Sequence, residues 1–510
     1  MRGRVLMVQG TGSSVGKSLL VAGLCRLFQQ DGLRVAPFKA QNMALNAFVT
    51  SEGHEVGRAQ AVQAEAAGVP PHVDMNPILL KPEGNARSQV VVMGKPWRSL
   101  PAATYYQHRR ELWPTVTAAL DRLRARHDLV IIEGAGSPAE INLRPRDIVN
   151  MAVALHAQAP VLLVGDIERG GVFASLIGTL ILLAPEEQRL VKGLIINKFR
   201  GDLSLLQDGL RMIEERAGKP VLGVVPFVPD LAIAEEDSLA LEQPELRDPV
   251  TAESAIDIAV VRLPRVSNFD DVDALRLQPG VRVRFVTTTG ELGRPHAVIL
   301  PGSKNTLDDL VWLRQRGLEQ TIRDLARTGT AVVGICGGYQ MLGQRLSDPH
   351  AVDGYSLEGG DGCSMPGLGL LPVDTVFQPQ KRTLQVKARV VSDRGFLAPI
   401  VGCEVEGYEI HMGETQGGQP LFEITGTGQT QGRRSEGAVD KTGRIMGTYL
   451  HGVFDTPAFR EAWLRSLGWQ GAGTLPPLRQ VREAAYKRLA GALRDSLDVA
   501  QLREIIDHAL

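Results

Sequence analysis

The stretch AVVGICGGYQMLG, Ala331 to Gly343, carries the sharpest structural signal in this chain of 510 residues. An apolar run leads into Cys336, which stands between Gly334 and Gly338, and a helix-like segment follows. This order predicts a buried strand, a tight turn and a helix, with the Cys336 thiol held at the positive end of the helix. We expect Cys336 to be a nucleophile and the N–H of Gly337 to face a developing oxyanion. An inert buried cysteine is the alternative.

The composition is that of an ordinary globular protein. Hydrophobic residues make up 44% and charged residues 22%, and 56 Lys and Arg balance 57 Asp and Glu. This balance gives no support to a general nucleic-acid-binding role. No apolar run approaches the roughly twenty residues that a membrane span requires, and the start does not have the pattern of a signal peptide. The four cysteines are scattered, so we expect neither a zinc site nor disulfides, and a cytoplasmic protein.

A second glycine-rich turn, GTGSSVGKS (Gly10–Ser18), follows the first apolar strand and precedes a helical stretch. This order is typical of a phosphate-binding P-loop. We expect the backbone at Gly12 and Gly16 to approach phosphates, Lys17 to reach the terminal phosphates and Ser18 to help hold Mg²⁺. The spacing is one residue longer than the common form and resembles the loop of dethiobiotin synthetase and its relatives. A glycine turn with an incidental lysine is the alternative.

Polar residues end the next predicted strands, and ligands gather at the carboxyl ends of strands in open α/β sheets. Glu133 is the candidate for a second Mg²⁺ contact, and Asp166 is a weaker metal or substrate candidate. Asn197 resembles the base-recognition corner of P-loop nucleotide binders. For each of these residues, an ordinary polar strand end is the alternative. The strand at 33–38 is followed by three candidate substrate contacts, Lys39, Gln41 and Asn42, and a solvated loop is an equal alternative for them.

We predict two doubly wound α/β domains. Mainly apolar strands alternate with helical segments over about residues 1–230, which favours a mostly parallel sheet covered on both faces. A polar stretch with two prolines predicts a linker, and a second series of strands leads up to the cysteine turn. The predicted division is a P-loop domain at 1–240, a linker at 241–255, a second α/β domain at 256–465 and a helical tail at 466–510.

A thiol nucleophile requires a base. His451 is the best-placed histidine, because it ends a strand-like run and precedes a glycine. His411 is the strongest competitor, and His296 and His350 are weaker ones. A glycine turn at Gly302, after another apolar strand, is a candidate for the second oxyanion donor; a simple turn is the alternative.

Several motifs together resemble one family. The run from Gly334 to Gln340 resembles the class I glutamine amidotransferase motif. Nearly the whole chain looks like the cobyric acid synthase family, and the related cobyrinic acid a,c-diamide synthases share both domain types. The motifs that carry the resemblance to cobyric acid synthases are Phe38–Met43, Asp147–Met151, Asp166–Phe173, Leu300–Thr306, Gly407–His411 and Gly447–Gly452.

The resemblance implies ATP-dependent amidation of the b, d, e and g carboxylates of adenosylcobyrinic acid a,c-diamide, with glutamine as nitrogen donor and Mg²⁺ with the ATP. It implies that Cys336 forms a thioester, that His451 is its base and that Asp147 belongs to a substrate motif. A dry path for ammonia is expected at the domain interface. Basic groups should meet the anionic corrinoid, and the candidates are Lys39, Arg144 and Arg146.

One departure from the amidotransferase pattern leaves the third member of the cysteine site open. Many class I enzymes place an acid two residues after the histidine, whereas Val453 stands there in this chain and the first acid is Asp455. Two other functions also remain open: a P-loop ATPase switch with a non-catalytic second domain, and a ligase that uses free ammonium. The sequence leaves the oligomeric state undetermined.

Overall fold

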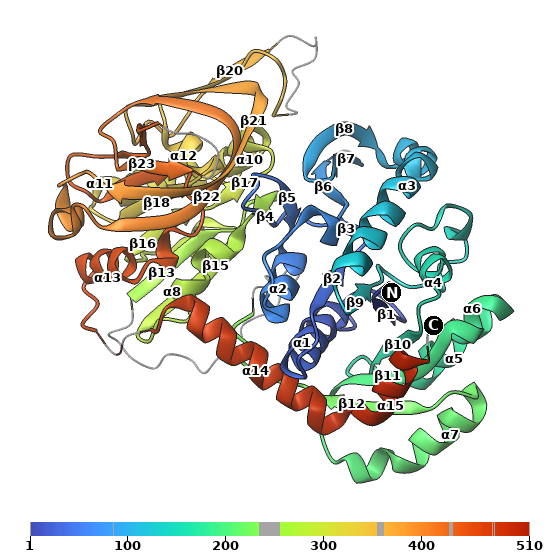
Figure 1. Cartoon of the computed structure of the whole chain (residues 1–510). Helices are drawn as coiled ribbons and strands as arrows, with labels where there is room; N and C mark the ends of the chain where they lie inside the picture. The colour runs from blue at the N-terminus through green and yellow to red at the C-terminus, as the bar shows by residue number, and fades with distance from the viewer. Residues whose placement is uncertain are drawn as a thin grey trace. The chain divides into compact units, whose positions relative to one another are not determined.

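The computed structural model describes residues 2–84, 86–233, 256–353, 362–427, 432–471, 473 and 475–508. The chain forms two compact units (Figure 1). The first comprises Met1–Ala44, Val56–Ile233 and Val481–Leu510, and the second comprises Leu45–Glu55 and Ala234–Gln480. Each unit is built on a mainly parallel six-stranded sheet, so the predicted α/β class is confirmed. The predicted linker at 241–255 lies outside the described residues.

The first unit has the strand order β12-β11-β10-β1-β9-β2, with every neighbouring pair parallel. Since β1 lies between β9 and β10, the strand order reverses at β1, where open sheets of this type bind ligands. The strands are β1 (Arg4–Gly10), β2 (Val35–Phe38), β9 (Leu129–Glu133), β10 (Val161–Asp166), β11 (Val191–Phe199) and β12 (Val221–Pro226).

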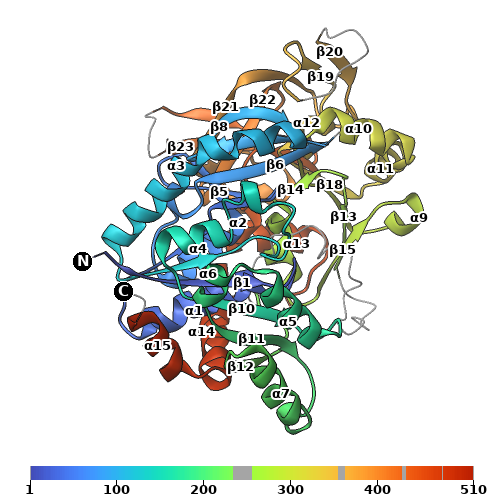
Figure 2. The same cartoon turned by 90° about the vertical axis from the view of Figure 1, so that its right-hand side faces the viewer.

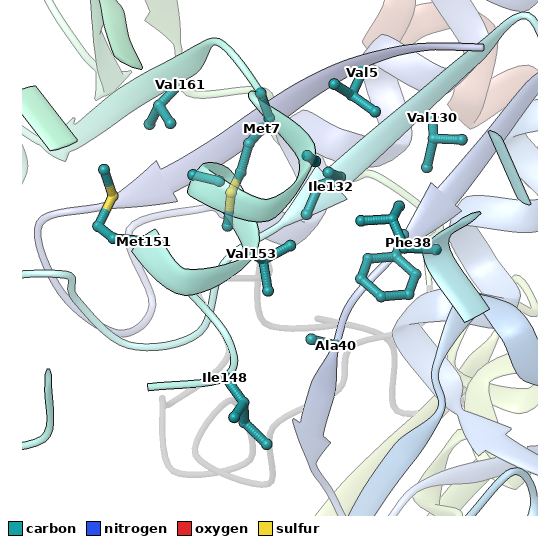
Figure 3. Packing of buried hydrophobic residues seen from close by; sticks show 14 of the residues in the cluster. Val5, Met7, Phe38, Ala40, Val130, Ile132, Ile148, Met151, Val153 and Val161 are labelled. Atoms are coloured by element: carbon teal, nitrogen blue, oxygen red, sulfur yellow. The ribbon is translucent and has the colours of Figure 1, made fainter. Parts of the chain in front are cut away.

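Both faces of this sheet are buried, which explains why its strands are apolar at nearly every position. Val5 and Met7 belong to a core cluster with residues of α3, α4 and α5, and Figure 3 shows Met7 beside Val153 of α4. Leu6 and Val8 alternate with them and are also buried, while α1 packs against β1, β2 and β9. The helices are α1 (Lys17–Gln30), α2 (Arg58–Ala67), α3 (Ala102–Arg126), α4 (Met151–Ala157), α5 (Val172–Leu182), α6 (Pro185–Leu190) and α7 (Gln207–Ala217).

Two segments join units that their sequence positions do not suggest. Residues 481–510, in the predicted tail, cluster with the first unit as most of α14 (Leu478–Ser496) and all of α15 (Val499–Asp507). In Figures 1 and 2, α14 lies beside α1, and α15 lies near β12. Residues 45–55 cluster with the second unit and contain β4 (Ala47–Val49). A small sheet in the first unit has the order β3-β6-β7-β8 and contains β3 (Gln41–Met43), β6 (Ile78–Gly84), β7 (Arg87–Val92) and β8 (Lys95–Pro101).

The second unit repeats the parallel design with the order β15-β13-β16-β18-β26-β25, in which only β25 is antiparallel to its neighbour. Its central strands β16, β18 and β26 end side by side, which places three loops at one edge. The strands are β13 (Ile256–Val261), β15 (Val281–Val286), β16 (Ala297–Leu300), β18 (Ala331–Ile335), β25 (Ala438–Val439) and β26 (Ile445–Thr448). The helices are α8 (Asp273–Arg276), α9 (Thr289–Leu292), α10 (Thr306–Gln315), α11 (Leu318–Arg327), α12 (Gly337–Leu342) and α13 (Pro457–Ser466).

A second, largely antiparallel sheet also belongs to this unit and was not predicted. Its longest pair is β21 with β22, and burial alternates along both ends of β21, as expected for a sheet with one covered face. Its strands are β19 (Arg345–Asp348), β20 (Cys363–Pro366), β21 (Val373–Val390), β22 (Glu404–Gly417), β23 (Phe422–Thr427) and β24 (Arg434–Glu436). In the described part of the chain, no helix is both long and apolar enough to cross a membrane.

Candidate active site

Cys336 occupies the tight turn that the sequence predicted. It lies between the end of β18 and the start of α12, with φ 52° and ψ −108°, a conformation that is strained for any residue with a side chain. Its N–H donates to the carbonyl of Thr448 at 2.8 Å. The flanking glycines are required by close packing, since a Cβ at Gly338 would lie 1.9 Å from the carbonyl oxygen of Leu300. A Cβ at Gly334 would lie 2.6 Å from the carbonyl oxygen of Gly338.

His451 has a buried carboxylate partner. Its Nδ1 lies 2.7 Å from Oδ2 of Asp271, and Oδ1 of Asp271 accepts the N–H of Gly452 at 2.8 Å. A hydrogen bond to a carboxylate requires the proton on Nδ1, so Nε2 is left to face other groups. Burial opposes a charge on this imidazole, but Asp271 and then Cys336 outweigh burial and raise the pKa of His451 to about 10.

Cys336 and His451 are close enough to interact, but no hydrogen bond of ordinary geometry joins them. The thiol of Cys336 donates weakly to the carbonyl of Ile410 at 3.7 Å. Among the described residues, none gives the buried Nε2 of His451 a hydrogen bond of ordinary geometry, although Cys336 acts on the imidazole by hydrogen bonding and charge. Such contacts are often long without substrate and tighten when it binds. The arrangement is that of a cysteine nucleophile, a histidine base and an orienting carboxylate.

Asp271 is the residue that the sequence analysis missed. The third position was left open because Val453 stands where many class I enzymes have an acid, and Asp271 lies 180 residues before the histidine. It belongs to a short 3-10 turn, Phe269–Val272, that follows the two-residue strand β14 (Val266–Ser267). The only sequence signal was an acidic pair soon after an apolar strand, and nothing in the spacing connected that pair to His451.

The predicted oxyanion donors lie next to the reacting side chains. Gly337 is the first residue of α12, so its N–H has no acceptor within the helix. A Cβ at Gly337 would lie 2.8 Å from the nitrogen of Ser303, and a Cβ at Gly302 would lie 3.4 Å from Cε1 of His451. The backbone of Gly302 and Ser303 therefore lies next to His451 and to Gly337, the residue after Cys336. The N–H of Ser303 is a further candidate donor to the oxyanion.

His411, the strongest competing histidine, is engaged elsewhere. Nδ1 of His411 lies 2.7 Å from the carbonyl of Gly413, and its ring stacks on Tyr449 with centroids 3.8 Å apart. Burial lowers the pKa of His411 to about 4, so this imidazole stays neutral. His411 lines a cavity of about 500 Å³ that also contains Arg382 and Arg434. These contacts support His451 over His411 as the base of Cys336.

The Lys17 side chain of the P-loop is hydrogen-bonded to nearby backbone carbonyls. Nζ of Lys17 donates to the carbonyls of Gly12 at 2.7 Å and Gly136 at 3.0 Å. Gly16 has φ 95° and precedes α1, so the loop turns sharply into the helix that begins with Lys17. The hydroxyl of Ser18 donates to Glu133 at 2.8 Å. This loop follows β1, at the point where the strand order reverses.

Glu133 is held ionised at the end of β9. Nζ of Lys39 lies 2.9 Å from its Oε1, and Nε2 of Gln63 donates to its Oε2 at 2.6 Å. Burial opposes ionisation, but Lys39 and these hydrogen bonds outweigh it and lower the pKa of Glu133. Ser18 and Glu133 form an oxygen donor pair that fits Mg²⁺ shared with phosphates. No cluster of three or more His, Cys, Asp or Glu among the described residues is arranged to hold a metal alone.

Asn197 braces the P-loop. Its Nδ2 donates to the carbonyl of Val15 at 2.8 Å, and a Cβ at Gly16 would lie 2.1 Å from that nitrogen. The next residue, Lys198, donates to the carbonyl of Ser14 at 2.8 Å and pairs with Asp166 at 2.9 Å. The ends of β10 and β11 therefore shape the phosphate-binding backbone, and a direct contact of Asn197 with a base stays a prediction.

Comparisons with known proteins agree with a nucleotide site in the first unit and a cysteine site in the second. Residues 6–241 match the CobQ/CobB/MinD/ParA nucleotide binding domain, and residues 257–459 match the CobB/CobQ-like glutamine amidotransferase domain. A cobyric acid synthase of Dehalococcoides mccartyi (strain 195) is 51% identical, with 99% of each chain covered. Those of Chloroflexus aurantiacus and Desulforudis audaxviator are each 52% identical over 99% of this chain and 100% of theirs. The chain belongs to the cobyric acid synthase family.

Membership in the cobyric acid synthase family establishes the general activity. The chain is a glutamine-dependent amidating enzyme of cobalamin synthesis, with an ATP-utilising nucleotide-binding domain and a glutamine amidotransferase domain. Both chemistries expected from the sequence are therefore present in one chain. This finding excludes a simple ATPase switch with a second domain unrelated to catalysis.

The candidate substrate residues of the family motifs are bonded within the first unit. Oε1 of Gln41 accepts the hydroxyl of Tyr105 at 2.5 Å, and Nδ2 of Asn42 donates to Gln60 at 3.0 Å. The carboxylate of Asp147 accepts three backbone N–H groups at the start of α4, from Val149, Asn150 and Ala152, at 2.8 to 2.9 Å. Asp147 thus orders a helix start, and a substrate contact for these residues stays a prediction. Arg144 forms an ion pair with Glu187.

Proposed function

We propose that this enzyme amidates the b, d, e and g carboxylates of adenosylcobyrinic acid a,c-diamide and takes each nitrogen from glutamine. The observation that carries the proposal is the buried set of Cys336, His451 and Asp271 in a chain that also has a braced P-loop. The names of the full-length relatives support the choice of substrate.

Glutamine hydrolysis follows from the geometry around Cys336. His451 accepts the thiol proton as the Cys336 sulfur attacks the side-chain amide carbon, and the Gly337 N–H stabilises the oxyanion. His451 gives the leaving nitrogen its proton as the C–N bond breaks, which leaves a thioester and ammonia. Water, deprotonated by His451, then attacks the thioester and releases glutamate. Asp271 keeps the imidazole in one tautomer and stabilises its charged form.

Activation of the acceptor belongs to the P-loop. A carboxylate is a poor electrophile, and transfer of the γ-phosphoryl group of ATP to it gives an acyl phosphate that ammonia attacks with loss of phosphate. Lys17 and the loop N–H groups stabilise the charge that develops on the transferred group. Bound with the nucleotide, Mg²⁺ would neutralise phosphate charge beside Ser18 and Glu133. A protected route for ammonia between the two chemistries stays a prediction.

Mass spectrometry of the corrinoid product tests the proposal. Incubation of adenosylcobyrinic acid a,c-diamide with the enzyme, ATP, Mg²⁺ and glutamine labelled with ¹⁵N in the side-chain amide should give four successive carboxyl-to-amide steps, each carrying the label. Unlabelled ammonium in the medium should not dilute the label if ammonia is transferred directly. An unchanged mass would refute the substrate, and full dilution would favour a ligase that uses free ammonium.

The matched variant is Cys336→Ser. It should lose glutamine-dependent product and glutamate release while it retains amidation at high ammonium concentration, because the acyl phosphate forms elsewhere. We also propose a cytoplasmic location, because the reaction consumes ATP and requires a reduced thiol. Cys25, Cys336, Cys363 and Cys403 are all free thiols in the structure.

A further inference from the structure

A short hairpin from the first half of the chain is built into the second unit. Leu45–Glu55 clusters with the second unit, although the residues on both sides of it belong to the first. Its strand β4 pairs with β5 (Glu55–Gly57), and the turn is closed by the N–H of Thr50, which donates to the carbonyl of His54 at 2.8 Å.

Polar contacts hold this hairpin against the second unit. The N–H of Ala47 donates to Oδ1 of Asn268 at 3.1 Å. Nε2 of Gln385, on β21, donates to the carbonyl of Val49 at 2.7 Å. Glu55, only 1% exposed, forms an ion pair with Lys381. A buried ion pair and two backbone hydrogen bonds specify one register for the hairpin, since a shifted hairpin would leave buried polar groups unpaired.

The side chain of Phe48 contacts the residue that stacks on the base. Its ring lies 5.9 Å from that of Tyr408, centroid to centroid. The ring of Tyr408 in turn stacks on His451 at 5.0 Å and 18°. The two residues also exchange backbone hydrogen bonds, His451 N–H to Tyr408 at 2.9 Å and Tyr408 N–H to His451 at 3.3 Å. The orientation of the imidazole therefore depends on where Tyr408 lies.

Asn268 connects the hairpin to the other partner of the base. Its Nδ2 donates to the hydroxyl of Tyr408 at 3.1 Å, while its Oδ1 accepts the N–H of Ala47. It has φ 52° and begins the 3-10 turn that carries Asp271, and its carbonyl accepts the N–H of Asp271 at 3.1 Å. One buried amide thus contacts the hairpin, the stacking tyrosine and the turn of the carboxylate.

We propose that the hairpin Leu45–Glu55 is a positioning element of the glutaminase site and that it acts on His451 and Asp271 through Asn268 and Tyr408. None of these residues reaches the reacting atoms; they hold the base and its carboxylate at the angle that serves Cys336. The inference rests on the proposed function of Cys336 and His451. It means that the glutaminase half is incomplete without eleven residues that the chain supplies before the P-loop unit ends.

The test compares Phe48→Ala, Asn268→Ala and Tyr408→Phe in the full-length enzyme, with Ser51→Ala as control because Ser51 is exposed at the hairpin tip. Glutaminase kcat should fall by about 10-fold or more in Phe48→Ala and Asn268→Ala, because small misplacements of a catalytic group are costly. The KM for glutamine and the ammonium-dependent amidation rate should stay within about twofold of the parent. Ser51→Ala should match the parent.

Two readouts separate positioning from a general structural role. In Asn268→Ala the limb of the glutaminase pH profile that reports His451 should move to lower pH, because a loosely held Asp271 stabilises the imidazolium less. Phe48→Ala and Asn268→Ala should be non-additive in combination, since they act on one network. Tyr408→Phe keeps the ring and removes one hydrogen bond, so it should fold and show a smaller loss.

Equal losses of glutaminase and ammonium-dependent amidation would overturn the inference, as would an unchanged kcat and pH profile in Phe48→Ala and Asn268→Ala. Failure of the underlying function is distinguishable, because glutamate release would then survive in Cys336→Ser. If Cys336→Ser releases no glutamate and the hairpin variants release it as fast as the parent, only the positioning role is wrong.

Discussion

At the scale of single residues, Asp271 should have the largest effect on the proposed glutaminase reaction. A thiol and an imidazole can form a pair without help, but the imidazole must present Nε2 to the sulfur. The 2.7 Å contact between Nδ1 and Asp271 imposes that orientation in a site where both side chains are at most 2% exposed. The carboxylate also supplies the charge that keeps His451 protonated once it has accepted a proton.

Asp271→Asn should therefore lower glutaminase kcat by about 100-fold or more, because an amide can hold the wrong imidazole tautomer and no longer stabilises the imidazolium. The pKa of His451 should fall with it, so the pH profile should move toward acid. Steady-state glutamate release from pH 6 to 10 measures both effects. Asp455→Asn, at the first acid after His451 in the sequence, is the control and should retain most activity. A silent Asp271→Asn would contradict the assignment.

At the scale of secondary-structure elements, the cysteine turn is the most constrained part of the second unit. β16 and β18 are parallel neighbours, with Leu300 paired to Gly334, so the helix after β18 passes directly over the end of β16. That approach leaves no room for a side chain at Gly338, in the first turn of α12.

Gly338→Ala should destabilise the second unit by about 3 kcal/mol, since a Cβ there would meet the backbone oxygen of Leu300 at 1.9 Å and a backbone group cannot move aside cheaply. Gly491→Ala, in the interior of α14, is the matched control because a Cβ there meets nothing within 4 Å. It should stabilise its unit by about 0.5–1 kcal/mol through helix propensity alone. Thermal unfolding followed by calorimetry distinguishes these results.

The loop that delivers His451 is held by a buried acid on β24. Glu436 accepts the N–H of Tyr449 at 2.6 Å and the hydroxyl of Thr448 at 2.7 Å. Burial, with a contribution from Glu409, raises the pKa of Glu436 from 4.5 to about 8. In the folded state, Glu436 therefore keeps its proton up to about pH 8. In the unfolded state, the same carboxyl loses its proton above about pH 4.5.

This difference predicts a pH-dependent stability. As pH rises from about 4.5 to about 8, Glu436 should cost the fold up to about 1.4 kcal/mol per pH unit. Glu436→Gln copies the neutral form, so the variant should gain stability relative to the parent across this window and not below it. Denaturant unfolding at several pH values measures the difference. A constant difference across the window would show that Glu436 is ionised in the folded enzyme.

At the scale of the whole molecule, the two ends of the chain complete the first unit. Arg26 of α1 pairs with Glu483 of α14 at 2.7 Å, and the hydroxyl of Tyr486 donates to Glu65 at 3.0 Å. Leu493 is fully buried, and a Cβ at Gly23 would lie 2.5 Å from its methyl group. Helix α14 is thus part of the core beneath the P-loop helix α1.

Leu493→Ala should destabilise the nucleotide-binding unit by about 2–5 kcal/mol, because a large apolar side chain would be replaced by a cavity. Arg494→Ala, which removes a surface ion pair with Asp31 from a side chain that is 40% exposed, should cost less than about 1 kcal/mol. Unfolding monitored with a fluorescent nucleotide probes this unit specifically. Equal, small losses in the two variants would mean that α14 only rests on the surface.

Much of the architecture could be predicted because its signals are local. The mainly apolar strands over residues 1–230 were predicted from their composition, and the structure has them as β1, β2, β9, β10, β11 and β12. The antiparallel sheet from β19 to β24 was not, because its strands alternate polar and apolar residues and pair across long loops. The hairpin at 45–55 was predicted to belong to the first domain, because its residues do not indicate which part of the chain it packs against.

The sequence by itself determined the chemistry that this protein carries, because a nucleophilic turn and a phosphate loop are each encoded in fewer than fifteen consecutive residues whose spacing dictates the backbone. Only the tertiary structure decided which distant groups complete the cysteine site. Asp271, Asn268 and the hairpin reach His451 from positions 180 or more residues away, and burial makes their hydrogen bonds specific only once the strands beneath them have assembled.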